Sequence, residues 1–187
     1  LRAGHKVTLV EQSEPDPGSK LMNRAVTRVY TPGSLYEESL IGSEESAVLA
    51  SLICSKDALG CAIIDSSTGD VQAFEFNGDG RWTRLLDELL RVSPRELVLG
   101  KKEAEMAMVG QIISQLEEIP VSQFESPAKS SLQALKKSMK ASDLGHVDLD
   151  RNPLAMQAVG LATDYLCSLH LSEEVSIRDI NIMEEDD

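Results

Sequence analysis

Basic residues are scarce in this chain. Its 187 residues include 18 Lys and Arg against 31 Asp and Glu, which gives a formal net charge of −13 at pH 7. Such a surface repels a phosphate backbone, so we do not expect autonomous nucleic-acid binding, although the chain could belong to a protein that binds DNA elsewhere. A hydrophobic fraction of 42% is nevertheless sufficient for a packed core.

Cysteine is also rare, and long apolar runs are lacking. The three cysteines, Cys54, Cys61 and Cys167, are odd in number and form no Cys-x-x-Cys pair, which disfavours a disulfide scaffold or a zinc site and favours a reducing, intracellular compartment. No apolar run approaches the roughly 20 residues that span a bilayer, so we expect no membrane association. The start, Leu1–Lys6, does not resemble a signal peptide. Because it also lacks an initiator Met, we expect the chain to be a fragment.

Motifs of self-contained active sites are lacking as well. The segment Ser66–Thr68 has no Gly-x-Ser-x-Gly frame, and Gly100–Lys102 lacks the spacing of a phosphate-binding loop. The three histidines are scattered along the sequence. These absences predict a chain without catalytic residues or a cofactor of its own.

The stretch Gly60–Phe76 organises what is present. A small, apolar run ends at Ile64, a polar turn follows through Asp65–Asp70, and an alternating run completes the segment. This pattern predicts a β-hairpin whose first strand is buried on both faces, with Ile63 and Ile64 both in the core.

Before this hairpin, alternation predicts strands at 6–11, 25–30 and 48–55. The first two are joined by a loop rich in Pro and Gly, and the acidic segment 34–46 reads as a linker. Two short strands cannot bury a core alone, so we assign them to a preceding domain.

After the hairpin, helices and strands alternate. Apolar spacing predicts helices at 82–93, 101–118, 126–140 and 153–169, with strands at 96–99 and 119–124. Pro120 suggests an edge position for the last strand. The main domain is therefore predicted to be α/β, a five-stranded mixed sheet with helices on both faces, in the order found in ribonuclease-H-like folds.

Asp65, Asp70 and Glu75 are the only carboxylates near the hairpin that suggest chemistry. A ribonuclease-H-like nuclease holds two metal ions with carboxylates of its sheet, and Asp65 ends a central strand. The favoured interpretation is that Asp65 accepts hydrogen bonds from Ser67 and Thr68 and shapes the turn. Glu75 lies well along another strand, and 96–100 offers no carboxylate at a matching end.

Several segments resemble the DNA mismatch-repair family MutS. The block Arg24-Ala25-Val26-Thr27-Arg28-Val29-Tyr30-Thr31-Pro32-Gly33 is fairly specific, and the preceding strand Gly4–Gln12 agrees with it. Three later segments support it by their order: Asp65–Gly69, Ser93-Pro94-Arg95-Glu96-Leu97 and the helix Ala158–Leu166.

This resemblance implies a domain layout and a mechanical role. Residues 1–32 would end the mismatch-binding domain, 33–46 would be a linker, 47–172 a connector domain with a ribonuclease-H-like fold, and 173–187 the start of the core and lever domain. The connector would be noncatalytic, relay the ATP state between domains and dock a MutL-type partner. The full-length parent would be a dimeric, DNA-dependent ATPase that uses ATP and Mg and binds mismatched DNA, in the cytoplasm or nucleoid of a bacterium or the nucleus of a eukaryote.

A basic stripe marks the expected partner-binding face. Lys129, Gln133, Lys136 and Lys140 recur at helical spacing, away from the apolar side of their helix. The stripe is either an ordinary solvated surface or the contact for acidic groups of the MutL-type protein.

The alternative to the connector is a free-standing, metal-dependent nuclease of the ribonuclease-H-like fold that uses Asp65.

Overall fold

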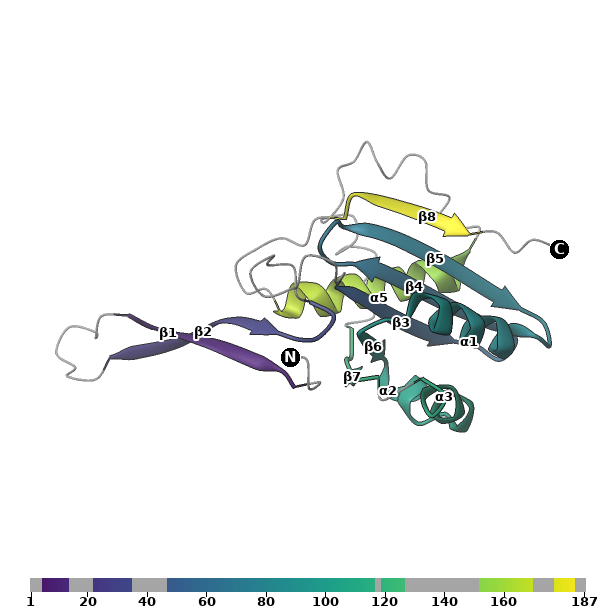
Figure 1. Cartoon of the computed structure of the whole chain (residues 1–187), viewed down its shortest axis with the longest axis horizontal. Helices are drawn as coiled ribbons and strands as arrows, with labels where there is room; N and C mark the ends of the chain where they lie inside the picture. Colours follow the sequence, from purple (N-terminus) through teal and green to yellow (C-terminus); the bar gives the residue numbers. More distant parts are fainter. Residues whose placement is uncertain are drawn as a thin grey trace.

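The computed structural model describes residues 5–13, 22–34, 47–116, 119–126, 152–169 and 177–183. In these residues a six-stranded mixed sheet carries helices on both faces, and a two-stranded ribbon extends away from it (Figure 1). Within the described part, no helix combines the length and the apolar character needed to cross a membrane.

The ribbon consists of β1 (Val7–Ser13) and β2 (Asn23–Tyr30), which pair antiparallel from Val7 opposite Tyr30 to Ser13 opposite Asn23. Both predicted strands are therefore present. Apolar side chains of the ribbon, such as Leu9 and Val10, remain close to half exposed. The ribbon becomes buried only at its base, where Tyr30 is 8% exposed.

The centre of the sheet is the predicted meander of β3 (Val48–Cys54), β4 (Ala58–Asp65) and β5 (Asp70–Asn77). β6 (Glu96–Leu99) adds parallel to β3, and β7 (Val121–Gln123) adds parallel to β6 at the edge. The edge position suggested by Pro120 is thus confirmed.

The predicted count of five strands is wrong, because β8 (Asp179–Met183) adds a sixth strand parallel to β5. The strand order is β7-β6-β3-β4-β5-β8. β8 comes from the segment 173–187 that we expected to begin another domain. Its five residues are too few to show their partner by periodicity, since the pairing depends on an edge that β5 supplies.

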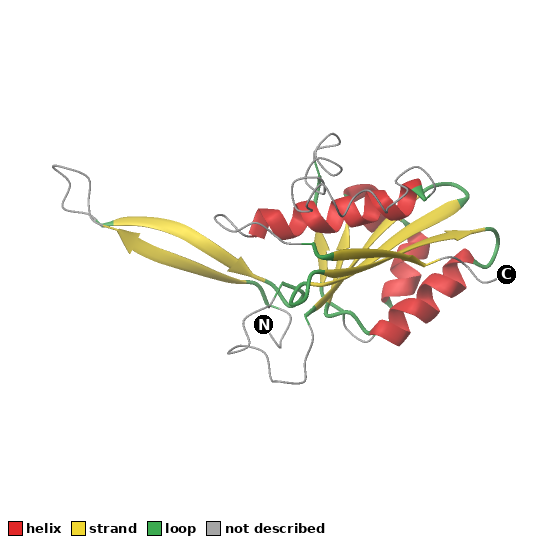
Figure 2. Cartoon of the chain, turned by 90° about the horizontal axis from the view of Figure 1, so that it is seen from above, coloured by secondary structure: helices red, strands yellow, loops and turns green. Residues whose placement is uncertain are grey.

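One core lies between the sheet and α5 (Pro153–Leu169). Among the described helices, α5 is the one that covers this face of the sheet (Figure 2). Ile64 of β4 is 1% exposed in this core. Ser51 lies against the same helix and donates a hydrogen bond of 2.7 Å to the Ala158 carbonyl.

The second core lies on the opposite face, beneath α1 (Arg81–Val92) and α3 (Ala107–Ile113). It contains Ile63, which is 5% exposed, so the predicted burial of both isoleucines is confirmed. In α1, Leu85 and Leu89 are buried, whereas Leu90 is 51% exposed.

The helix predicted at 101–118 is broken in two. α2 (Lys101–Ala104) is followed by its C-cap residue, Glu105. Met106 then adopts an extended backbone with ψ 126° before α3 begins. The Glu103 side chain turns inward and accepts the Cys54 amide at 3.1 Å. This contact fixes α2 to the end of β3, while Val109 and Ile112 resume the apolar spacing in α3.

Candidate functional site

Asp65 has the turn-forming role favoured by its position. Its Oδ1 accepts the Ser67 amide at 2.9 Å and the Ser67 hydroxyl, while the Thr68 hydroxyl accepts the Asp70 amide instead of bonding Asp65. Gly69 completes the turn with a left-handed φ of 79° and donates to the Asp65 carbonyl at 2.8 Å. Within the described residues, no three His, Cys, Asp or Glu side chains gather as a metal site.

Glu75 has a different partner from the one that a nuclease site would require. Its carboxylate accepts the backbone amides of Leu154 at 2.8 Å and Ala155 at 3.3 Å. These amides lie in the first turn of α5 and have no acceptor within that helix. A negative side chain there also interacts favourably with the helix dipole. Glu75 is therefore the cap of α5, supplied by β5.

Glu96, at the start of β6, is the most deeply buried carboxylate among the described residues, with 0% exposure. Its Oε2 accepts the Gly33 amide at 3.0 Å, whereas its Oε1 accepts the Tyr165 hydroxyl at 2.6 Å and the Ser122 hydroxyl. A buried carboxylate is costly unless donors surround it, and here three neutral donors do so. The two oxygens thus join the base of the ribbon to β7 and α5.

Gly33 belongs to the turn that follows the ribbon, Thr31–Ser34, which we call the exit turn. Thr31 and Ser34 are both 0% exposed, and the Ser34 hydroxyl accepts the Thr31 amide at 2.8 Å. On the other side, the Ser66 hydroxyl donates to the Gly33 carbonyl at 2.9 Å. A Cβ at position 33 would lie 2.9 Å from the Glu96 Cβ, so glycine is required by close approach.

Tyr165 connects this site to α5 and to the ribbon. Its ring meets Phe124 edge-to-face with 5.6 Å between centroids, and the Lys6 ammonium lies 5.5 Å from the Tyr165 centroid. Burial raises the pKa of the Tyr165 hydroxyl, and the charge and hydrogen bond of Glu96 raise this pKa further, against smaller opposing effects of the Ser122 and Thr31 hydroxyls. The phenol therefore stays protonated and donates to Glu96.

The residue types and spacings alone did not predict this site, although the segments that carry the family resemblance contain its residues. Gly33, Glu96 and Tyr165 each belong to one of the segments that carry the family resemblance. The structure brings these three segments together around one carboxylate. Because of this convergence we treat the surroundings of Glu96 as the candidate functional site.

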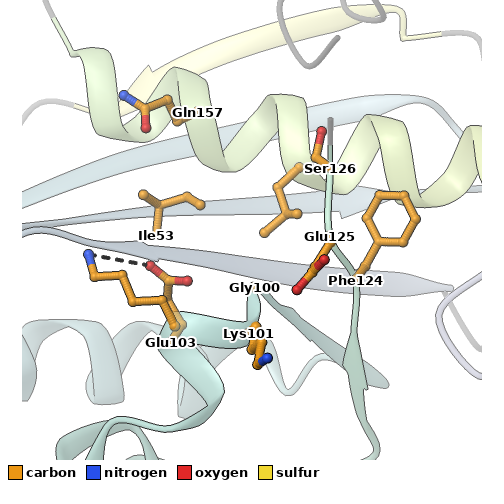
Figure 3. Close-up of a pocket in the computed structure, with 10 residues that line it drawn as sticks. Ile53, Gly100, Lys101, Glu103, Phe124, Glu125, Ser126 and Gln157 are labelled. Carbon is orange, nitrogen blue, oxygen red and sulfur yellow. Dashed lines mark ion pairs between the residues drawn. The ribbon is translucent and has the colours of Figure 1, made fainter. Parts of the chain in front are cut away.

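A second candidate is a cavity of about 690 Å³ at the carboxyl ends of β3, β6 and β7 (Figure 3). Open α/β sheets commonly bind ligands at this edge. The lining is mixed: Ile53, Phe124 and Leu161 are apolar, and the polar residues are Lys101, Lys102, Glu103, Glu125, Ser126 and Gln157. Glu103 accepts the Cys54 amide, Lys102 donates to the Cys54 carbonyl, and Ser126 bonds Asp164. These groups are engaged with the chain itself, so we assign no ligand to the cavity.

The predicted partner-binding residues Lys129, Gln133, Lys136 and Lys140 lie outside the described residues, so their placement stays a prediction.

Together, the contacts around Glu96 define a mixed α/β domain on which a separate strand ribbon is fixed through a buried turn. The family model for MutS domain II matches residues 47–178, and the model for MutS domain I matches residues 1–39. The boundary between the two matches follows the exit turn. The chain belongs to the MutS family.

Individual relatives agree with this assignment. The chain is 34% identical over 178 residues to the DNA mismatch repair protein MutS of Symbiobacterium thermophilum, covering 91% of the chain and 20% of that protein. It is 31% identical to MutS of Halothermothrix orenii, covering 89% of the chain and 18% of the relative. It is 33% identical to MutS of Myxococcus xanthus, covering 87% of the chain and 18% of that relative. The chain thus spans about a fifth of the length of these relatives.

Proposed function

We propose that this chain is a noncatalytic connector of a MutS-type mismatch-repair protein and relays the state of the ATPase to the mismatch-binding part. The observation that carries the proposal is the Glu96 site, where one carboxylate of β6 accepts the Gly33 amide of the exit turn together with hydroxyls of β7 and α5. A segment that transmits motion needs such a fixed attachment, because a freely rotating linker would not transmit force.

The proposed fold of the connector is ribonuclease-H-like. Three antiparallel strands followed by parallel β6 and β7 on the β3 side support this assignment. Residues 1–32 would end the mismatch-binding domain, and 33–46 would link it to the connector. We propose to extend the connector beyond residue 172 through β8, because β8 pairs with β5. The core and lever domain would then begin after Met183.

The remaining activities belong to the full-length parent in this proposal. It would be a dimer that hydrolyses ATP with Mg and binds mismatched DNA through its other domains. The relatives are DNA mismatch repair proteins, which supports this assignment. The net charge of −13 supports the assignment of DNA contact to parts other than this one.

The relay is tested by replacing residues 47–183 of the full-length protein with a flexible linker of similar reach. We expect mismatch binding to persist, while the change in ATP hydrolysis on adding mismatched DNA is lost. Titration of homoduplex and mismatched DNA with a steady-state ATPase assay measures both. A variant with normal mismatch-dependent ATP hydrolysis would exclude the relay.

We also propose that Lys129, Gln133, Lys136 and Lys140 dock a MutL-type partner. Complementary charge speeds encounter and sets register, so charge reversal at Lys136 and Lys140 should weaken recruitment in a salt-dependent manner. Mismatch binding and ATP hydrolysis should remain intact. The matched control is charge reversal at Lys56 and Lys101, which are exposed and change the net charge equally. If both double variants recruit the partner like the parent, the stripe is a solvated surface.

A further inference from the structure

The Glu96 carboxylate divides its two oxygens between different parts of the chain. Oε1 accepts hydroxyls of β7 and α5, which belong to the α/β domain. Oε2 accepts the amide of Gly33, which belongs to the exit turn. The Oε1 contacts can therefore persist when the turn leaves, whereas the Oε2 contact cannot.

Partial detachment of the exit turn would leave a polar group without its partner. Glu96 is 0% exposed with the turn in place, so a small shift that breaks the Gly33 bond without admitting water would leave Oε2 buried and without that donor. An unsatisfied buried group, and a charged one above all, is unfavourable by more than the ordinary contribution of one hydrogen bond. Partial detachment is consequently disfavoured, and the turn is either docked or fully released.

The contacts around the turn favour the docked state from several sides. Lys6, just before β1, lies over the Tyr165 ring, and Val29 of β2 packs against the core beneath α5. Ser66, in the turn between β4 and β5 at the same end of the sheet as Glu96, donates to the Gly33 carbonyl. These contacts use the residue that precedes β1, the strand β2 and the exit turn.

We propose that Glu96, Ser122 and Tyr165 form a latch that fixes the exit turn, so that the base of the ribbon and the α/β domain move as one rigid body. This inference rests on the proposed relay function and adds the residues that transmit it. It predicts that the turn Thr31–Ser34 is not the hinge between the two parts.

The latch is tested by hydrogen exchange with mass spectrometry on the full-length protein. In the parent, a peptide covering 30–35 should exchange slowly. Glu96→Met keeps the side-chain volume but removes the acceptor, so we expect exchange of this peptide to accelerate roughly tenfold or more. A peptide covering β4 should exchange at the parent rate.

Two further variants separate a specific latch from general loss of stability. Glu96→Gln should restore slow exchange in part, because its amide oxygen can accept Gly33 and its amide nitrogen can donate to the hydroxyls. Glu103→Met is the matched control, since Glu103 is also buried and also accepts a backbone amide, that of Cys54. It should leave the 30–35 peptide unchanged.

Several results would overturn the latch. These are an unchanged 30–35 peptide in Glu96→Met, equal acceleration of the β4 peptide, or equal acceleration of 30–35 in Glu103→Met. If Glu96→Met does not fold, Tyr165→Phe removes one hydroxyl while keeping the ring, and it must accelerate the same peptide for the proposal to stand.

The exchange result is independent of the relay. A latch that opens in Glu96→Met while mismatch-dependent ATP hydrolysis stays normal would support the latch and count against the relay. Loss of slow exchange together with loss of mismatch-dependent ATP hydrolysis would support the latch and the relay.

Discussion

Gly60 shows how one residue determines the position of a whole helix. A Cβ at this site would lie 2.1 Å from the Leu154 carbonyl oxygen and 2.6 Å from the Ala155 amide nitrogen. The first turn of α5 therefore rests directly on the backbone of β4. No other residue type allows this approach without moving one of the two elements.

Gly60→Ala should accordingly destabilise the protein by about 3 kcal/mol, because the clash is with backbone atoms that cannot rotate away. Chemical denaturation followed by circular dichroism measures the loss. The control is Gly110→Ala in α3, where no atom lies within 4 Å of the added Cβ. That variant should gain about 0.5 kcal/mol or more from helix propensity. Equal stability of the two variants would contradict the close contact.

The buried thiols offer a pH-dependent test. Burial raises the pKa of Cys54 to about 12, with Glu103 adding to the effect, and burial likewise raises the pKa of Cys61 to about 12. Both should stay protonated and resist a disulfide reagent at pH 8.5 until the protein is unfolded, whereas partly exposed Cys167 is accessible.

The raised pKa values of these two thiols also make the stability of the protein depend on pH. In the unfolded chain these thiols lose protons near pH 9, but in the folded chain they do so near pH 12, so the folded state binds more protons between these values. Their contribution to stability is complete below pH 9 and is lost as the pH rises toward 12. A free energy of unfolding that increases over this range would disprove it.

At the scale of elements, α5 depends on a cap that it does not carry. Pro153 suits the first turn of a helix, and the Met156 amide bonds the Asn152 carbonyl at 3.1 Å. The amides of Leu154 and Ala155, which precede Met156 in the first turn, donate to the Glu75 carboxylate of β5. The helix start is thereby tied to the strand by a charged hydrogen-bond acceptor.

Glu75→Gln should cost about 1 kcal/mol, since the amide keeps an acceptor but loses the charge that complements the helix dipole. Urea titration at low and high salt measures the change, which should shrink as salt screens the charge. Asp57→Asn, at an exposed carboxylate, serves as the control and should have little effect. A loss no larger than that of the control would remove the capping role.

At the scale of the whole molecule, the described sheet carries a packed core on each of its faces. Two of the three carboxylates considered for a metal site have structural roles, since Asp65 shapes a turn and Glu75 caps α5, and the buried Glu96 binds the exit turn. Donors of the chain engage Oδ1 of Asp65, Oε2 of Glu75 and both oxygens of Glu96.

The chain should therefore neither cleave DNA or RNA nor hydrolyse ATP when Mg²⁺ or Mn²⁺ is supplied. Incubation of labelled substrates with the purified chain and an Asp65→Asn variant measures this. Metal-dependent cleavage by the parent that disappeared in the variant would instead establish the nuclease alternative.

The sequence by itself determined the central meander and much of what covers it. Alternation and apolar runs record which face of a strand or helix is buried, so β3 to β6, α1, α5 and the burial of Ile63 and Ile64 were predictable. The turn role of Asp65 was predictable for the same reason, because its partner is two residues away.

The tertiary structure alone decided the contacts between residues distant in the chain. Gly33 and Glu96 are 63 positions apart, Glu96 and Tyr165 are 69 apart, and Glu75 and Leu154 are 79 apart. Periodicity reports burial but not the identity of a partner, which follows from strand order and helix placement. The pairing of β8 with β5, the capping of α5 and the fixing of the exit turn on Glu96 depend on that arrangement, because each needs two elements that meet only when the sheet has formed.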